Sequence, residues 1–186
     1  NIGVACRRTI KALRMFLFFQ QAPDRAFERL YLCFRLSPYG SPRIRAVKKE
    51  RKLYFWDWVQ VPDPGARLEN LVASELLRFC HLVEDTEGYD MELRFLRDTD
   101  KREVDFVVLK QGKPLFGVEC KTGEKAVSQA VHYFSERTAI PHFYQVHLGT
   151  NRKMISQKIS LIPLPLFVEE LAQARKLGSP LTTTDH

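Results

Sequence analysis

Residues 103–109 constrain the fold of this chain more than any other stretch. Their sequence is Glu-Val-Asp-Phe-Val-Val-Leu, so alternating side chains place apolar groups on both faces of a strand. A strand that is apolar on both faces belongs in the middle of a sheet that is covered on both sides, as in α/β folds. Asp105 then projects into one of the covering layers, where an uncompensated charge is costly.

The segments around this strand predict the order helix, three strands, helix, strand. Asp63 followed by Pro64 is typical of a helix cap and a first-turn proline. Hydrophobic spacing predicts helices over 66–81, 124–137 and 167–176, with a basic amphipathic helix over 7–19. It predicts strands over 31–36, 52–58, 91–97, 103–109, 115–121 and 142–147.

Positive charge is concentrated at the start of the chain. Residues 1–52 hold 13 Lys and Arg against 3 Asp and Glu, whereas the rest holds 16 against 19, which together give the net charge of +7. Such a run is either a solvated loop or a surface that binds a nucleic-acid backbone. The densest part comprises Arg43, Arg45, Lys48, Lys49, Arg51 and Lys52.

Several classes of site and location are disfavoured. The four cysteines lie far apart without zinc-ligand spacing, which favours free thiols in a reducing, cytoplasmic setting. The longest apolar run, Met15–Phe19, is too short to span a bilayer, so we expect no membrane partner. No P-loop motif occurs, so we expect no ATP site here. Because the chain begins with Asn1, we expect it to be part of a longer polypeptide.

Four charged residues break the local hydrophobic pattern. Glu69 lies on the apolar stripe of its predicted helix, and Asp105 lies in the central strand. Glu119 and Lys121 share one face of the next strand, because residues i and i+2 project together. The stripe that contains Glu69 also carries Val72, Ala73, Leu76 and Cys80.

The loop between the last two of the three central strands decides whether Asp105 and Glu119 meet. A two-residue loop places them on opposite faces, and a three-residue loop places them on one face. We expect the three-residue loop, with Gly112 in the left-handed position. That register sets Asp105 opposite Gly117, which leaves open space beside the carboxylates.

Two neighbouring carboxylates raise one another's pKa unless a cation lies between them. Hard oxygen ligands suit Mg²⁺ or Mn²⁺, which would be held by Asp105 and Glu119 while Lys121 orients or deprotonates water. The arrangement therefore predicts metal-assisted hydrolysis of a phosphodiester. The alternative is a buried Asp–Lys or Glu–Lys ion pair that only stabilises the sheet.

This pattern resembles the PD-(D/E)XK nuclease superfamily. The resemblance implies a restriction-endonuclease-like α/β core, a nucleic-acid substrate (DNA), Mg²⁺, and catalytic positions at Glu69, Asp105, Glu119 and Lys121. Gln129 and Tyr133 resemble the Gln-x-x-x-Tyr motif of RecB-type nucleases and would support the site.

A closer resemblance is to the nuclease-like domain at the C-terminus of bacterial and archaeal AAA+ family ATPases. It is carried by Tyr31–Tyr39, Lys52–Asp57, Leu68–Ala73 and Arg102–Val107. It implies an upstream ATPase domain as a partner. It also implies a basic winged-helix-like remnant over 1–52, a nuclease-like domain over 53–176 and a flexible tail over 177–186. We therefore expect a Mg²⁺-dependent nuclease. The alternatives are an inactive nuclease-fold module that binds nucleic acid or a partner, and an interaction domain whose charged cluster is structural.

Overall fold

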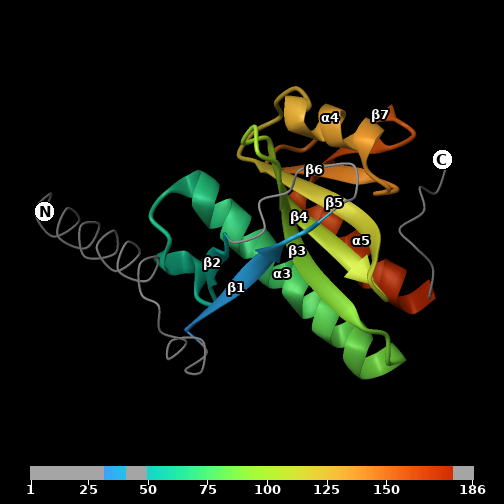
Figure 1. Ribbon diagram of the computed structural model, residues 1–186. Coiled ribbons are helices and arrows are strands. Elements are labelled where there is room, and N and C mark those ends of the chain that lie inside the picture. The colour runs from blue at the N-terminus through green and yellow to red at the C-terminus, as the bar shows by residue number, and fades with distance from the viewer. Residues whose placement is uncertain (1–31, 41–49, 178–186) are drawn as a thin grey trace, which may run out of the picture.

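The computed structural model describes residues 32–40 and 50–177 of the chain. The predicted helix over 7–19 and four of the basic residues, Arg43, Arg45, Lys48 and Lys49, lie outside the described residues. The described part is an α/β structure with one mixed eight-stranded sheet in the order β2-β1-β3-β4-β5-β6-β8-β7 (Figure 1). The α/β class predicted from the strand at 103–109 is therefore confirmed.

The strands are β1 (Cys33–Pro38), β2 (Lys52–Phe55), β3 (Met91–Arg97), β4 (Glu103–Lys110), β5 (Lys113–Lys121), β6 (Phe143–His147), β7 (Lys153–Ser156) and β8 (Ile159–Pro163). The described helices are α3 (Pro64–Glu87), α4 (Gln129–Arg137) and α5 (Leu164–Leu177), with a short 3-10 helix, η1, at Trp58–Gln60. β1 and β2 form an antiparallel pair, and β1 joins the sheet beside β3.

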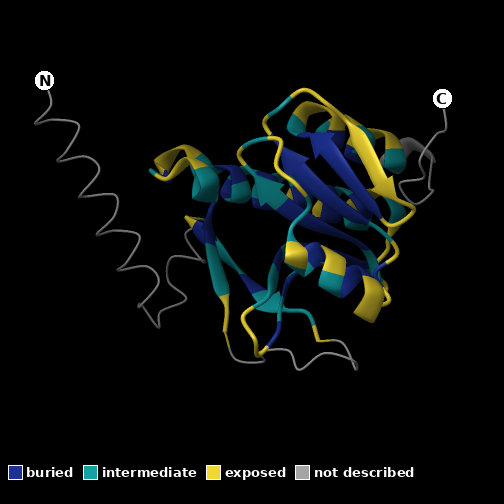
Figure 2. Cartoon of the chain, turned by 90° about the horizontal axis from the view of Figure 1, so that it is seen from above, coloured by how far each residue is buried: buried dark blue, intermediate teal, exposed yellow. Residues whose placement is uncertain are grey.

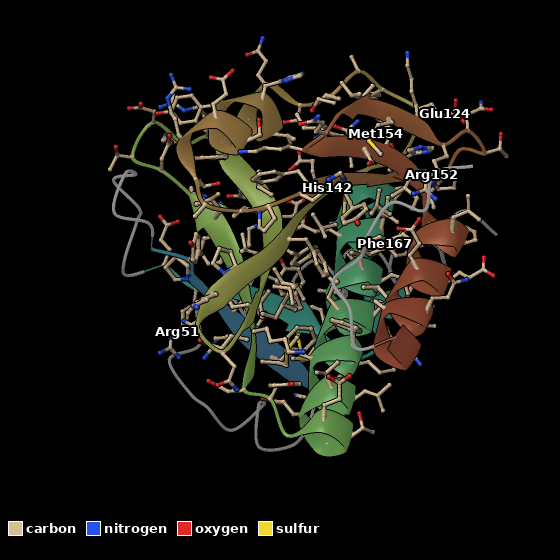
Figure 3. All side chains as sticks on the ribbon, turned by 90° about the vertical axis from the view of Figure 1, so that its right-hand side faces the viewer. Arg51, Glu124, His142, Arg152, Met154 and Phe167 are labelled. Atoms are coloured by element: carbon tan, nitrogen blue, oxygen red, sulfur yellow. The ribbon has the colours of Figure 1, made fainter. Side chains whose placement is uncertain are left out.

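The helices form two layers. α3 and α5 run side by side on one face of the sheet, and α4 lies on the other (Figure 3). The core beneath α3 and α5 includes Phe106, Val108 and Val118, whereas Val104 and Val107 pack in the core beneath α4. β4 is therefore covered on both faces, as its sequence predicted.

α3 begins where the sequence predicts. The Asp63 side chain accepts a hydrogen bond from the backbone amide of Ala66 at 2.8 Å, and Pro64 occupies the first turn. The helix ends later than expected, at Gly88, whose φ of 72° stops the chain in the left-handed region.

Several boundaries differ from the predictions, and two strands, β7 and β8, were not predicted. The last helix begins at Leu164, three residues earlier than expected. The strand predicted to reach Trp58 ends at Phe55 and is followed by η1. α4 begins at Gln129 because the preceding residues form a loop held by Gln145. The side-chain oxygen of Gln145 accepts a hydrogen bond from the backbone amide of Ser128, and its side-chain nitrogen donates to the carbonyls of Lys125 and Ala126. β7 was not predicted, because its residues are all exposed and have no apolar alternation (Figure 2). Within the described residues, no helix is both long and apolar enough to cross a membrane.

Candidate functional site

The β4–β5 hairpin turns differently from the expectation. Lys110 pairs with Lys113, so the loop contains only Gln111 and Gly112. Both have positive φ angles, 54° and 70°, as a tight hairpin turn of the mirror-image type requires. The predicted three-residue loop is therefore wrong.

A bulge in β5 compensates for the shorter loop. Leu109 pairs with Pro114 while Val108 pairs with Phe116, so Leu115 is an extra residue in β5. The bulge places Glu119 on the face of the sheet that a three-residue loop would have given it, although the register differs. Asp105 nevertheless does not lie opposite Gly117, because Gly117 pairs with Val107.

The expected open space at Gly117 is also filled. A Cβ atom added there would lie 2.6 Å from Cδ1 of Phe143, on the neighbouring strand β6. Gly117 therefore admits an aromatic ring of the core and leaves no room for a ligand.

A second bulge lies at Asp105 itself. Arg94 pairs with Val107 and Leu96 with Val104, so β4 has one more residue than β3 across this stretch. The β4–β5 pairing ends nearby, at Phe106 and Val118. Beyond that pair, Asp105 Oδ2 accepts a hydrogen bond from the backbone amide of Cys120 at 2.8 Å. The Asp105 carboxylate thus bridges the two central strands where their pairing ends.

Glu119 and Lys121 form an ion pair beside this point. Lys121 Nζ lies 2.6 Å from Glu119 Oε1, and the Glu119 side chain is 7% exposed. Burial raises the pKa of Glu119, and Lys121 and the Asp105 backbone only partly oppose that rise. Glu119 Oε2 is buried without a hydrogen-bond partner among the described residues. An acceptor of this kind costs free energy until a donor or a cation reaches it.

Asp105 is the most strongly perturbed carboxyl group of the site. Burial raises its pKa well above the ordinary value, and the negative charges of Glu69 and Glu119 raise it further. The ammonium of Lys52, 3.6 Å from Oδ1, and the Cys120 amide act in the opposite direction. The site therefore has more negative charge than its own cations balance.

Lys52 is the cation that several acids share. Its Nζ lies 2.9 Å from Glu69 Oε1 and also pairs with Glu103. Burial alone would lower the pKa of Lys52, but Asp105, Glu69 and Glu103 together raise it, so the ammonium stays charged. The Tyr54 hydroxyl donates to Glu69 Oε1 at 2.7 Å. Glu69 is thereby held toward the sheet at the edge of the apolar stripe of α3.

We use the name acidic cluster for four carboxylates and the lysine that lies among them: Glu69, Glu103, Asp105, Glu119 and Lys52. Sequence reasoning placed Lys52 in a basic run that is either a solvated loop or a nucleic-acid-binding surface, and it missed Glu103 and Tyr54. A signal for Lys52 and Tyr54 was present, because residues i and i+2 of a strand project together and so reach the same neighbour. Of the predicted basic run, the structure describes only Lys52 and the exposed Arg51.

A cavity of about 500 Å³ adjoins the acidic cluster. Lys52, Tyr54 and Glu69 form part of its wall, and three arginines contribute positive charge: Arg35, Arg51 and Arg97. Arg97 is engaged with Glu50 and Glu103. The cavity therefore places guanidinium groups next to the carboxylates.

Gln129 and Tyr133 lie on α4 and make no hydrogen bond to the acidic cluster within the described residues. Gln129 is exposed in the first turn. The ring of Tyr133 contacts two guanidinium groups, with Arg102 at 3.9 Å and Arg137 at 4.3 Å from its centroid. Tyr133 therefore contacts surface arginines. Electrostatic interactions instead link the charges of Glu69, Asp105, Glu119 and Lys121.

The acidic cluster is not a complete metal cage. Over residues 32–40 and 50–177, no three His, Cys, Asp or Glu side chains converge closely enough to hold a metal ion by themselves. Mg²⁺ commonly needs only one or two carboxylates and keeps several waters. Asp105 and Glu119 are the two candidates of that kind.

Comparison with known proteins gives one match. A family model described as "Domain of unknown function (DUF4143)" matches residues 64–167, which is more than half of the 186-residue chain. The match includes α3, the three central strands and the whole of α4. No curated protein and no solved structure matches the chain.

Proposed function

The chain belongs to the DUF4143 family, a domain of unknown function, and we propose from its site that it is a Mg²⁺-dependent nuclease domain. The observation that carries the proposal is the pair Asp105 and Glu119. Glu119 is buried and Asp105 is partly buried. Both have raised pKa values, and Glu119 Oε2 has no partner in the described chain. We further propose that α3, β3–β5, α4 and β6 form a restriction-endonuclease-like core, because they follow its order along the chain.

A divalent cation fits these residues. Oxygen donors suit Mg²⁺ or Mn²⁺, and Glu119 Oε2, which has no hydrogen-bond partner among the described residues, offers a lone pair. Added positive charge would also lower the cost of keeping Asp105 ionised. Bound there, Mg²⁺ would supply positive charge to a phosphodiester oxygen and acidify a water molecule.

The remaining residues have separate tasks in this proposal. Burial alone would lower the pKa of Lys121, but Glu119 raises it, so Lys121 keeps its proton. It therefore orients the attacking water and stabilises developing negative charge, and does not act as the base. Lys52 and Tyr54 position Glu69 beside Asp105.

The substrate in this proposal is nucleic acid, with DNA as the first choice. The cavity beside the acidic cluster contains Arg35, Arg51 and Arg97, whose side chains suit phosphate groups. The resemblance described above makes an AAA+ ATPase domain of the same polypeptide the proposed partner.

One observation favours a second candidate, a module that binds nucleic acid or a partner without cutting. The Lys52 ammonium already lies among Glu69, Glu103 and Asp105, where it neutralises charge without a metal. In that case the acidic cluster serves only the stability of the fold.

Calorimetric titration of Mn²⁺ and Mg²⁺ into the chain separates the two candidates. We expect saturable binding that is lost in Asp105→Asn and retained in Asp85→Asn, a matched change at an exposed position on α3. Metal-dependent cleavage of labelled single- and double-stranded DNA is then measured with the same proteins.

Two results would count against the nuclease proposal. Absence of metal binding by the folded wild-type chain favours the non-cutting module. Metal binding and cleavage that both survive Asp105→Asn remove Asp105 from the site. Circular dichroism of each variant ensures that a loss of binding is not a loss of folding.

A further inference from the structure

A second cavity, of about 450 Å³, lies where β6 ends and α4 begins. It is formed by the loop after β5, the first part of α4, the end of β6 and strands β7 and β8. Figure 3 shows Glu124, at this cavity, well apart from Arg51, at the first one. The polar residues that line it are Glu124, Lys125, His132, His147, Asn151 and Lys153.

His147 carries an unmet hydrogen-bonding requirement in the wall of this cavity. The side chain is fully buried, and its Nδ1 accepts a hydrogen bond from the Gly149 amide at 3.1 Å. Because Nδ1 accepts, the hydrogen of the neutral ring resides on Nε2. Nε2 has no partner in the part of the chain that the structure describes. A buried donor of this kind requires an acceptor, such as a ligand oxygen.

The charges around the cavity favour an anion. Lys125 and Lys153 are exposed, and within residues 50–177 neither ammonium forms an ion pair. The one acid in the wall, Glu124, is already engaged by Asn151 and by the Thr150 amide. These hydrogen bonds, the Asn151 side chain first, lower the pKa of Glu124 to about 2. A ligand therefore meets two lysines, two histidines and a carboxylate that is already hydrogen-bonded.

We propose that this cavity binds a phosphate group, with His147 Nε2 donating to one oxygen and Lys125 and Lys153 balancing its charge. The inference does not depend on metal-assisted cleavage, because none of these residues belongs to the acidic cluster. His147 nevertheless pairs in register with Lys121 on β5. A phosphate held here would therefore lie one strand away from the proposed reaction centre.

The test follows the imidazole nitrogens of His147 by NMR in the full chain, with inorganic phosphate as the probe and EDTA present. Chloride at matched ionic strength is the reference. We expect a saturable shift of the His147 signals and a dissociation constant about tenfold weaker in Lys153→Met, because a charge-assisted contact is lost. Lys153 is exposed on an edge strand, so this variant should fold. Lys113→Met, an exposed lysine at the β4–β5 turn, is the matched control and should not change binding.

Two DNA oligonucleotides then identify the source of the phosphate. A shift of His147 that requires a 5′-phosphate indicates a terminal phosphate, and an equal shift without one indicates a backbone phosphodiester. The proposal is overturned if none of the three probes shifts His147, or if Lys153→Met binds as tightly as the control. Because EDTA excludes metal, failure here leaves the cleavage experiment untouched, and the reverse also holds.

Discussion

Glu119 and Gln145 are neighbours in the sheet with opposite hydrogen-bonding states. They pair in register on the adjacent parallel strands β5 and β6, and both are almost fully buried. The Gln145 amide uses its oxygen for Ser128 and its nitrogen for the carbonyls of Lys125 and Ala126. Glu119 binds Lys121 through one oxygen, while the other has no partner in the described chain.

The contrast separates a buried polar group that builds the fold from one that is available to a ligand. Gln145 fixes the loop before α4, and its hydrogen bonds repay the cost of its burial. Glu119 has a similar position but keeps an unmet requirement and a raised pKa. Substitution of Gln145 should therefore lower the stability of the fold, whereas substitution of Glu119 should affect ligand binding more than stability.

The largest effect should follow Lys121→Ala. This change removes the cation that faces developing negative charge in the proposed reaction, so we expect the rate of metal-dependent cleavage to fall about 10²–10³-fold. Single-turnover cleavage of labelled DNA measures the loss. Lys113→Ala, at the far end of the same strand, is the control. An unchanged rate in Lys121→Ala would contradict the assigned role.

The next effect concerns Gln145→Ala. The substitution leaves the Ser128 amide and the carbonyls of Lys125 and Ala126 without their internal partner, so we expect the free energy of unfolding to fall by about 3 kcal/mol. Urea denaturation followed by circular dichroism measures it. Gln60→Ala, at an exposed position in η1, should change stability little. A similarly small change for Gln145→Ala would remove the contrast with Glu119.

A smaller effect should appear in the pH dependence of stability without divalent cations. Burial raises the pKa of Asp105 and Glu119, so the folded state binds protons that the unfolded state has released. Their contribution to the unfolding free energy is present below the unfolded pKa of about 4 and is lost as pH rises, by at most about 1.4 kcal/mol per pH unit for each group.

Comparison with the double variant Asp105→Asn, Glu119→Gln isolates this contribution. The difference in unfolding free energy between wild type and variant should shift in favour of the variant from pH 4 to pH 7. A divalent metal ion should raise the unfolding free energy of the wild type at pH 7 if it binds these carboxylates. A difference that is flat with pH would show that the two carboxyl groups titrate as they do in the unfolded chain.

The smallest effect should be that of Glu119→Gln alone at pH 7. The neutral amide avoids the cost of burying a charge but loses the ion pair with Lys121, so the two contributions largely cancel. We expect the free energy of unfolding to stay within about 1 kcal/mol of wild type. A loss as large as that of Gln145→Ala would assign Glu119 a structural role.

Local patterns in the sequence predicted the central strands well. The predicted strand over 91–97 coincides with β3, and the capped start of α3 lies one turn or less from its predicted position. These elements are specified by alternation, hydrophobic stripes and a capping residue, all of which are local. β7 lacks such a pattern and is held in the sheet by its pairing with β8.

The arrangement of the site was harder to predict from the sequence, because the pairing between strands determines it. Nothing in the sequence around Leu115 or Asp105 marks the position of a bulge. Each bulge nevertheless changes which face of the sheet the following residues occupy. Likewise, a run of basic residues does not reveal that Lys52 turns inward. It does so because the pairing of β2 with β1 brings it against α3 and β4.

The bulge at Leu115 also restricts how the hairpin can change in length. Insertion of a single residue beside Leu115, within the paired part of β5, would turn Glu119 and Lys121 toward the apolar layer beneath α3, where burying the two charges is costly. Insertion of two residues would restore the original face. Within the paired part of β5, length can therefore change by two residues without moving the site, whereas an odd change requires that a bulge be gained or lost.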